Sequence, residues 1–129
     1  MWLNKKYILA SVLLGASLSV HATHISEPIF SESKTKYRLG EKIIVNGWVS
    51  YDNKPTPNVL LAFKMTHSDG SIATEESYPS DLNGQFLFEY STNKQVPGKY
   101  LITITSHCQE IHRSICTYKN KTLSIVIVE

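Results

Sequence analysis

The sequence has few long hydrophobic runs, and the longest is too short to cross a membrane with ease. It extends over residues 7–20, whereas a transmembrane helix needs about 20 apolar residues. Lys5 and Lys6 precede this run and small residues up to Ala22 follow it, which is the pattern of a secretory signal peptide. We therefore predict that residues 1–22 are removed on export, and that the mature protein is secreted or periplasmic with no membrane span.

Net charge is also nearly absent. The formal charge of the chain is +2, and Lys5 and Lys6 of the predicted signal peptide account for both positive charges. The remaining chain is close to neutral and lacks the basic excess that binding to phosphate groups requires. This composition argues against nucleic acid or an anionic membrane surface as a partner.

Motifs of the common enzyme classes are missing as well. The sequence contains no Gly-x-Ser-x-Gly nucleophile motif, no His-Glu-x-x-His zinc motif and no glycine-rich phosphate loop. The adjacent acids Glu75 and Glu76 lie in a predicted strand, where successive side chains point to opposite faces. We therefore predict a protein that is not an enzyme and needs no cofactor.

Cysteine is scarce, with two residues in the chain. In an exported protein, Cys108 and Cys116 are expected to form a disulfide because the compartment is oxidising. An alternative is a copper or zinc site in which His107 and His112 join the two cysteines, with His24 as a further donor. That alternative would make the protein a carrier of a metal or another small ligand.

Helical periodicity is absent, and the pattern that replaces it is alternation of apolar and polar residues between short turns. This pattern is typical of strands that bury one face. We predict an all-β fold, a single antiparallel β-sandwich of about seven strands with immunoglobulin-like architecture. The clearest predicted strands are residues 42–51, 59–66, 72–78, 85–90, 99–108 and 122–128.

Three segments follow from this pattern. Residues 1–22 form the signal peptide, residues 23–36 a polar lead-in with a short edge strand over 29–33, and residues 37–129 the β-sandwich domain. Within the sandwich, Gly47 interrupts a strand and predicts either a bulge or a close approach of another backbone segment.

Charge and turn residues make two further local predictions. Residues 72–78 are polar and contain Glu75 and Glu76, which is typical of an exposed edge strand because charge there blocks unwanted pairing. Residues 81–84, with the sequence Asp-Leu-Asn-Gly, predict a β-turn.

Turn glycines, prolines and a late tyrosine give the chain a resemblance to known secreted modules. The set comprises Tyr37, Gly40, Gly47, Pro55, Gly70, Asn83, Gly84, Pro97, Gly98 and Tyr100. Through it, residues 37–105 resemble β-sandwich modules of the macroglobulin second-domain type and the carboxypeptidase regulatory-like type. The resemblance implies the fold and a binding, spacing or scaffold role. The macroglobulin thioester needs glutamine three residues after its cysteine, and Ile111 occupies that position after Cys108.

Aromatic residues and an open strand edge predict how a partner could be bound. Trp48 and Tyr51 could form an exposed patch that contacts a protein or a sugar ring, unless the lead-in or the 109–121 connection covers Trp48. Strand 72–78 offers backbone groups to an added strand. The first hypothesis is thus a protein partner or self-association, and an alternative is a carbohydrate-binding module. Asn120 begins a glycosylation sequon that only a eukaryotic secretory pathway would use.

Overall fold

The computed structural model describes residues 24–109 and 116–129, so the predicted signal peptide and His112 lie outside the described residues. The described chain forms ten strands and contains no helix. Hence it also contains no helix that could cross a membrane. The strands are β1 (His24–Phe30), β2 (Lys36–Arg38), β3 (Lys42–Tyr51), β4 (Lys54–Pro55), β5 (Leu60–His67), β6 (Ile72–Pro79), β7 (Gln85–Ser91), β8 (Gly98–Ser106), β9 (Cys116–Tyr118) and β10 (Asn120–Val128).

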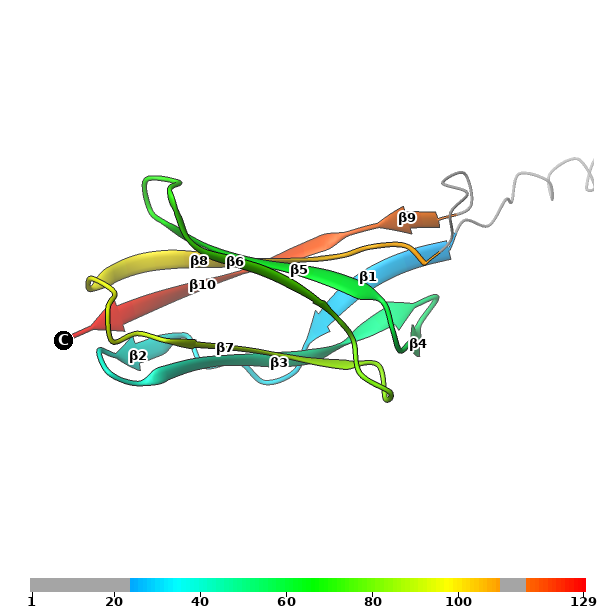
Figure 1. The fold of residues 1–129 in the computed structure, drawn as a ribbon, viewed down its shortest axis with the longest axis horizontal. Coiled ribbons are helices and arrows are strands. Elements are labelled where there is room, and N and C mark those ends of the chain that lie inside the picture. The colour runs from blue at the N-terminus through cyan, green and yellow to red at the C-terminus, as the bar shows by residue number, and fades with distance from the viewer. Residues whose placement is uncertain (1–23, 110–115) are drawn as a thin grey trace, which may run out of the picture.

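The strands form two five-stranded sheets that pack face to face (Figure 1). Sheet A has the order β4-β3-β1-β9, with β7 also paired to β3, and sheet B has the order β2-β10-β8-β5-β6. The neighbouring strands are antiparallel except for β1 with β9 and β2 with β10, which are short parallel pairs of three residues each. The prediction of an all-β sandwich is therefore confirmed.

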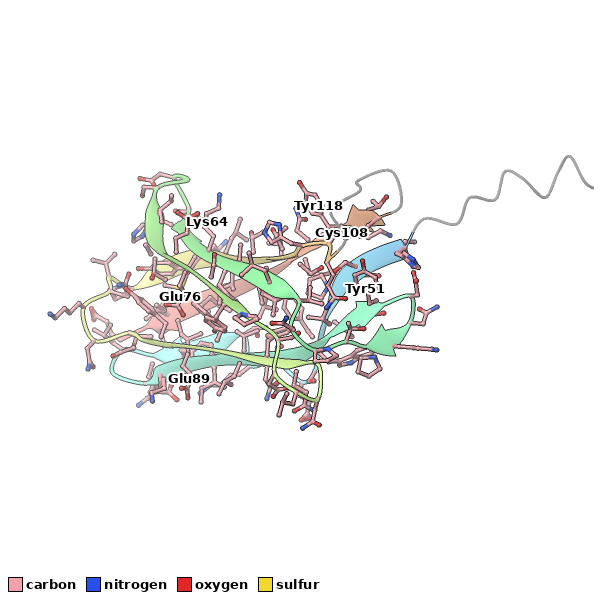
Figure 2. The ribbon with its side chains drawn as sticks, turned by 45° about the vertical axis from the view of Figure 1, so that its right-hand side comes forward. Tyr51, Lys64, Glu76, Glu89, Cys108 and Tyr118 are labelled. Atoms are coloured by element: carbon pink, nitrogen blue, oxygen red, sulfur yellow. A yellow bond between two sulfur atoms is a disulfide. The ribbon has the colours of Figure 1, made fainter. Side chains whose placement is uncertain are left out.

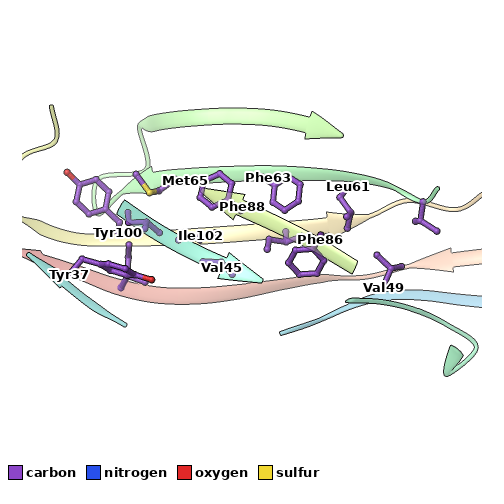
Figure 3. Packing of buried hydrophobic residues seen from close by; sticks show 14 of the residues in the cluster. Tyr37, Val45, Val49, Leu61, Phe63, Met65, Phe86, Phe88, Tyr100 and Ile102 are labelled. Carbon is purple, nitrogen blue, oxygen red and sulfur yellow. The ribbon is translucent and has the colours of Figure 1, made fainter. Parts of the chain in front are cut away.

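The core lies between the sheets and follows the alternation that the sequence predicts. Alternate residues of β3, β5, β7, β8 and β10 point inward, and Figure 3 shows several of them in contact across the two layers. Aromatic rings fill the centre, where Phe63 stacks on Phe88 with ring centroids 5.5 Å apart. The fully buried side chains include Ile43, Val45, Val49, Leu61, Met65, Ile102 and Ile104.

The predicted lead-in is the main correction to the sequence analysis. We expected a loose segment with a short edge strand over residues 29–33, but β1 starts at His24 and lies inside sheet A between β3 and β9. Pro28 is compatible with that position because pairing with β9 extends only from His24 to Ser26. The carbonyl of Ser26 accepts a hydrogen bond from the N–H of Lys119, so the backbone groups of Ser26 face the β9 side of β1. Pro28, two residues later, faces the same side at a point where β9 no longer pairs with β1, so its missing N–H leaves no bond unmade.

Gly47 marks a close backbone approach rather than a bulge. The register of β3 is continuous with both β1 and β7 around this residue. A Cβ atom at Gly47 would collide with the carbonyl oxygen of Ile29 and lie 2.8 Å from the ring of Phe86. The glycine therefore allows β1 to lie against β3.

Candidate functional site

The strand edges of the two sheets differ in how much backbone they leave open. The edge strands β4, β2 and β9 are only two or three residues long. β6 has eight residues and, within the described chain, pairs only with β5. The prediction that residues 72–78 form an edge strand is thus confirmed, and β6 is the longest edge strand of the described sheets.

The direction of the backbone groups of β6 follows from the hydrogen bonds at its end. Ser80 donates its N–H to the carbonyl of Val59 on the β5 side, at 2.9 Å. Because alternate residues of a strand direct their N–H and C=O groups to opposite sides, Glu75 and Ser77 present theirs to the open side. Pro79 is the next residue that faces the open side, and it offers a carbonyl but no N–H to an added strand. The open part of the edge is therefore centred on Glu75 and Ser77.

The neighbouring edge, that of β7, is partly covered by side chains at its start. Asp81 accepts the backbone N–H of Gln85 at 2.8 Å through Oδ1, and its own N–H bonds to the carbonyl of Gln85 at 2.8 Å. Two residues along, the hydroxyl of Tyr78 donates to the carbonyl of Leu87. These bonds use the outward backbone groups of β7 at Gln85 and the outward carbonyl at Leu87. The start of the β7 edge is therefore less available to an added strand than the open part of β6, and Glu89 lies beyond this cover.

Tyr78 connects the two edges and lies in an acidic neighbourhood. Its ring stacks on Phe63 with centroids 4.5 Å apart. Partial burial, together with the smaller effect of the nearby carboxylates of Glu76 and Glu89, raises the pKa of the Tyr78 hydroxyl to about 12. Figure 2 shows Glu76 between Lys64 of β5 and Glu89 of β7 in this view. Tyr78 thus keeps its proton and its bond to β7 at neutral pH.

The two predicted aromatic surface residues do not form one patch. Tyr51 is 9% exposed, and its hydroxyl donates to Sγ of Cys116 at 3.3 Å inside the core. Trp48 is half-buried on the outer face of sheet A, between Ile29 of β1 and Gln85 of β7. The prediction that Tyr51 lies on a partner surface is wrong, because Tyr51 faces the opposite side of β3 from Trp48.

Trp48 is accompanied on its face by two more exposed apolar side chains. Ile44 is 43% exposed and Leu87 is 46% exposed, on β3 and the adjacent β7. Asn46 lies directly opposite Leu87, so Ile44 and Trp48, two residues to either side of Asn46, are both diagonal neighbours of Leu87. This outer face is a second candidate contact surface beside the edge of β6.

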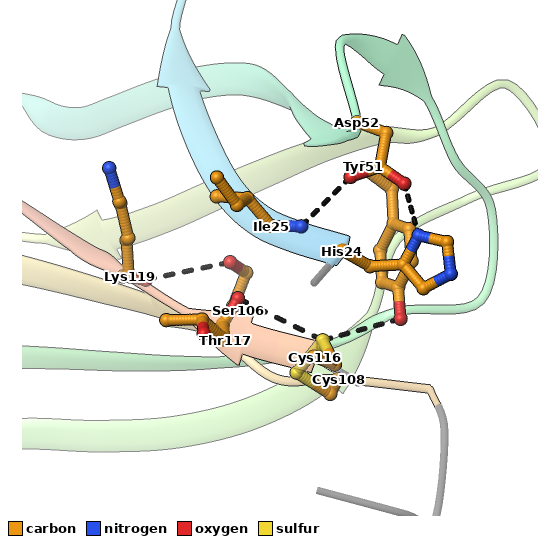
Figure 4. The surroundings of a disulfide bond; sticks show 9 residues. All are labelled: His24, Ile25, Tyr51, Asp52, Ser106, Cys108, Cys116, Thr117 and Lys119. Carbon is orange, nitrogen blue, oxygen red and sulfur yellow. Dashed lines mark hydrogen bonds and ion pairs between the residues drawn. A yellow bond between two sulfur atoms is a disulfide. The ribbon is translucent and has the colours of Figure 1, made fainter. Parts of the chain in front are cut away.

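The predicted disulfide between Cys108 and Cys116 is present, with the two Cα atoms 6.0 Å apart (Figure 4). It links the end of β8 to the start of β9, where Cys116 lies opposite His24 of the parallel strand β1. The ring of His24 bonds to the carboxylate of Asp52, and the same carboxylate accepts the N–H of Ile25 at 2.9 Å. These bonds lower the pKa of Asp52, with the bond from His24 as the larger cause.

Metal ligation receives little support from the described residues. Among residues 24–109 and 116–129, no three His, Cys, Asp or Glu side chains are grouped so that they could hold a metal ion. His107 instead stacks on Tyr118 with ring centroids 5.6 Å apart, and both cysteines are in the disulfide. His112 lies outside the described residues, so the His107 and His112 pair stays a prediction.

Sequence reasoning missed the features that distinguish one edge from the other. The role of Tyr78 depends on its reach to Leu87 across the gap between the sheets, and no sequence pattern encodes that distance. The stacking of half-buried His107 on exposed Tyr118 was also missed, because the two rings come from segments on either side of the disulfide loop. A signal was available at Asp81, whose predicted turn is confirmed and whose carboxylate covers the start of β7.

Comparison with known proteins supports the fold alone. The sequence matches no protein-family model and no curated protein. Among solved structures, a β-glucosidase from Listeria innocua, both free and in complex with glucose, is similar with a TM-score of 0.52 at 10% identity. The match covers 82% of this chain and 16% of the glucosidase chain. A CARDB domain from Pyrococcus furiosus, solved in complex with di-metal ions, has a TM-score of 0.46 at 10% identity, covering 81% of this chain and 87% of that domain.

These comparisons agree with the architecture and do not extend it. A likeness at 10% identity is one of fold, because unrelated functions share the same sandwich. The more specific resemblance of residues 37–105 to macroglobulin second-domain or carboxypeptidase regulatory-like modules is not confirmed by any of these matches. The described chain is a β-sandwich whose longest edge strand is β6.

Proposed function

We propose that this protein is an exported, non-enzymatic β-sandwich that binds a protein partner by adding a strand of that partner to β6. The observation that supports this function is the open edge of β6, with free backbone groups at Glu75 and Ser77. Strand addition gains affinity from main-chain hydrogen bonds and specificity from alternate side chains. The cover over the start of β7 and the short edges elsewhere favour this position for the added strand.

Export is part of the proposal and rests on residues 1–22 together with the disulfide. Signal-peptide features predict a secreted or periplasmic protein, and a disulfide is compatible with such a compartment. An intact mass of the exported protein, taken without reduction, tests this part. A mass for residues 23–129 less two hydrogens supports cleavage after Ala22, whereas retention of residues 1–22 or of two free thiols would contradict it.

The resemblance to macroglobulin second-domain and carboxypeptidase regulatory-like modules supports the same kind of role. Such modules act as binding, spacing or scaffold units, and residues 37–105 share their turn pattern. We therefore propose an accessory or scaffold subunit. Self-association stays within this proposal as one form of partner.

A photo-crosslinking amino acid placed at Ser77 tests the site of binding in the producing cells. Thr122, which is exposed on β10 of the same sheet, is the matched control position. We expect a discrete cross-linked protein from position 77 that is lost when Glu75 is changed to proline, because proline removes an outward N–H. The proposal fails if position 122 gives the same adduct, or if Glu75→Pro leaves the adduct from position 77 unchanged.

A second candidate function is carbohydrate binding through Trp48. The half-buried indole on the outer face of sheet A favours it, while the burial of Tyr51 leaves the proposed platform with one aromatic ring. Trp48→Ala is expected to abolish retention on a glycan column while Trp48→Phe keeps part of it. A thermal melt of both variants is the control, and loss of folding in Trp48→Ala with normal glycan retention in Trp48→Phe would identify Trp48 as a packing residue.

A further inference from the structure

The carboxylates of β6 are exposed and form no ion pair with a described residue, although Lys64 lies opposite Glu75 on β5. Glu75 and Glu76 are both exposed, and none of the four ion pairs between described residues includes either of them. Glu89, on the adjacent edge, has its one described ion pair with Lys42 at 3.9 Å, which is at the limit for such a contact. The side of the sandwich that carries the open edge therefore presents negative charge to an incoming strand.

The two glutamates of β6 lie on opposite faces of sheet B. Glu75 is directly opposite Lys64 of β5, so its side chain belongs to the outer face of sheet B. Glu76 is opposite the buried Phe63, so its side chain lies on the inner side, near Tyr78 and Glu89. A strand laid along β6 places successive side chains on opposite faces, and two adjacent residues of it would meet one glutamate each.

The same charges disfavour a second copy of this chain as the added strand. Antiparallel pairing of β6 with its copy centred on Glu75 or on Glu76 places that glutamate directly against the same glutamate of the copy. Like charges directly opposite each other destabilise a strand pair. Charged residues on an edge are a common protection against such pairing. The edge is thus open to a partner of opposite charge and protected against itself.

We propose that the strand bound by β6 is an extended segment with two adjacent basic residues, lysine or arginine, that lie opposite Glu75 and Glu76. This inference rests on the proposed function of strand addition at β6 and defines the chemistry of its partner. One basic side chain pairs with Glu75 on the outer face, and the next reaches Glu76 on the inner side. Acidic or uncharged segments leave these carboxylates unpaired, so repulsion as well as attraction sets the choice of partner.

Three capped eight-residue peptides test the inference with the intact mature protein. All have the sequence Thr-Val-Thr-x-x-Thr-Val-Thr, and the two central residues are Lys-Lys, Gln-Gln or Glu-Glu. Binding is followed by shifts of the backbone amide NMR signals at low and at high salt. We expect the Lys-Lys peptide to shift signals along β6 and to bind about tenfold more tightly than the Gln-Gln peptide, with the difference decreasing as salt screens the charges.

Two kinds of variant separate the preference for basic residues from strand addition itself: one reverses the charges of β6, and the other removes a backbone N–H. Glu75→Lys with Glu76→Lys should reverse the preference to the Glu-Glu peptide, whereas the control Glu32→Lys, on an exposed segment outside both sheets, should not. Ser77→Pro removes one outward N–H and should weaken the Lys-Lys peptide about tenfold without changing its preference over Gln-Gln. Circular dichroism of each variant verifies that the sandwich is intact.

The outcomes distinguish the failure of the inference from the failure of strand addition. Equal binding of the Lys-Lys and Gln-Gln peptides along β6, lost in Ser77→Pro, would retain strand addition and overturn the basic partner. Binding of the Lys-Lys peptide that Ser77→Pro leaves unchanged would overturn strand addition, since charge alone would then hold the peptide. Absence of any signal shift on β6 with all three peptides would overturn both.

Discussion

At the scale of single residues, Gly47 lies where β1 pairs closely with β3, and a methyl group there has no room. We expect Gly47→Ala to lower the free energy of unfolding by about 3 kcal/mol, because its Cβ would collide with the Ile29 carbonyl and the Phe86 ring. Chemical denaturation measures the change. Asn46→Ala, an exposed position next to it on the same strand, is the control and should change stability by about 0.5 kcal/mol or less. Equal effects of the two variants would show that β1 does not lie this close to β3.

Tyr78 makes a second residue-scale prediction, in alkaline solution. An unfolded tyrosine loses its proton near a pKa of about 10, and the folded Tyr78 does so near about 12, so the folded state favours the neutral hydroxyl. Its stabilising contribution is therefore complete below pH 10 and is lost as the pH rises from 10 to 12. At pH 7, Tyr78→Phe should cost about 1 kcal/mol through the lost bond to Leu87.

The measurement is the difference in melting temperature between the wild type and Tyr78→Phe across this pH range. We expect the difference to shrink between pH 10 and 12, which separates Tyr78 from the other tyrosines because these are common to both proteins. A difference that stays constant over this range would contradict the hydrogen bond between Tyr78 and β7.

At the scale of elements, the disulfide holds a short strand in place. Cys116 starts β9, which has three residues and pairs with β1. Replacing both cysteines with serine should cost about 2–3 kcal/mol by the loop-entropy argument and leave the sandwich folded, because β3, β5, β7, β8 and β10 supply most of the core and β9 contributes only Cys116 to it. Denaturant titration of the double variant, beside the wild type with and without reductant, measures this. A variant without a cooperative transition at 25 °C would show that the bridge is required for folding.

The elements also differ in how well the sequence predicts them. Strands β3, β5, β7 and β8 alternate apolar and polar residues, and burial of one face makes that pattern visible in the sequence. The two buried residues of β1 are Ser26 and Pro28, so its burial has little apolar signature. The parallel pairs of β1 with β9 and β2 with β10 join distant segments, which local patterns cannot encode. At the candidate site, charge predicted the edge strand at Glu75 and Glu76, but the cover over β7 required the structure.

At the scale of the whole molecule, β1 and β2 join the first described residues to both sheets. β1 pairs with β3 in sheet A, and the chain then crosses to sheet B, where β2 pairs with β10. The backbone N–H of Val126 also donates to the carbonyl of Thr35 at 2.9 Å, so the crossing segment itself is bonded to sheet B. This arrangement makes residues 24–36 a part of the folding unit rather than a lead-in to it.

A chain that starts at Tyr37 tests this directly against one that starts at Thr23. Removing residues 23–36 takes β1 out of sheet A, exposes Val49 and Tyr51 of β3 along one side and leaves β9 without its partner. Burial of side chains of this size contributes about 2 kcal/mol each, which is a large share of the stability of a domain with about 100 residues. We expect the shorter chain to lose its cooperative thermal transition and the longer one to keep it, both followed by far-ultraviolet circular dichroism. A cooperative melt of the shorter chain within a few degrees of the longer one would instead place the start of the domain at residue 37 and reduce β1 to an accessory strand.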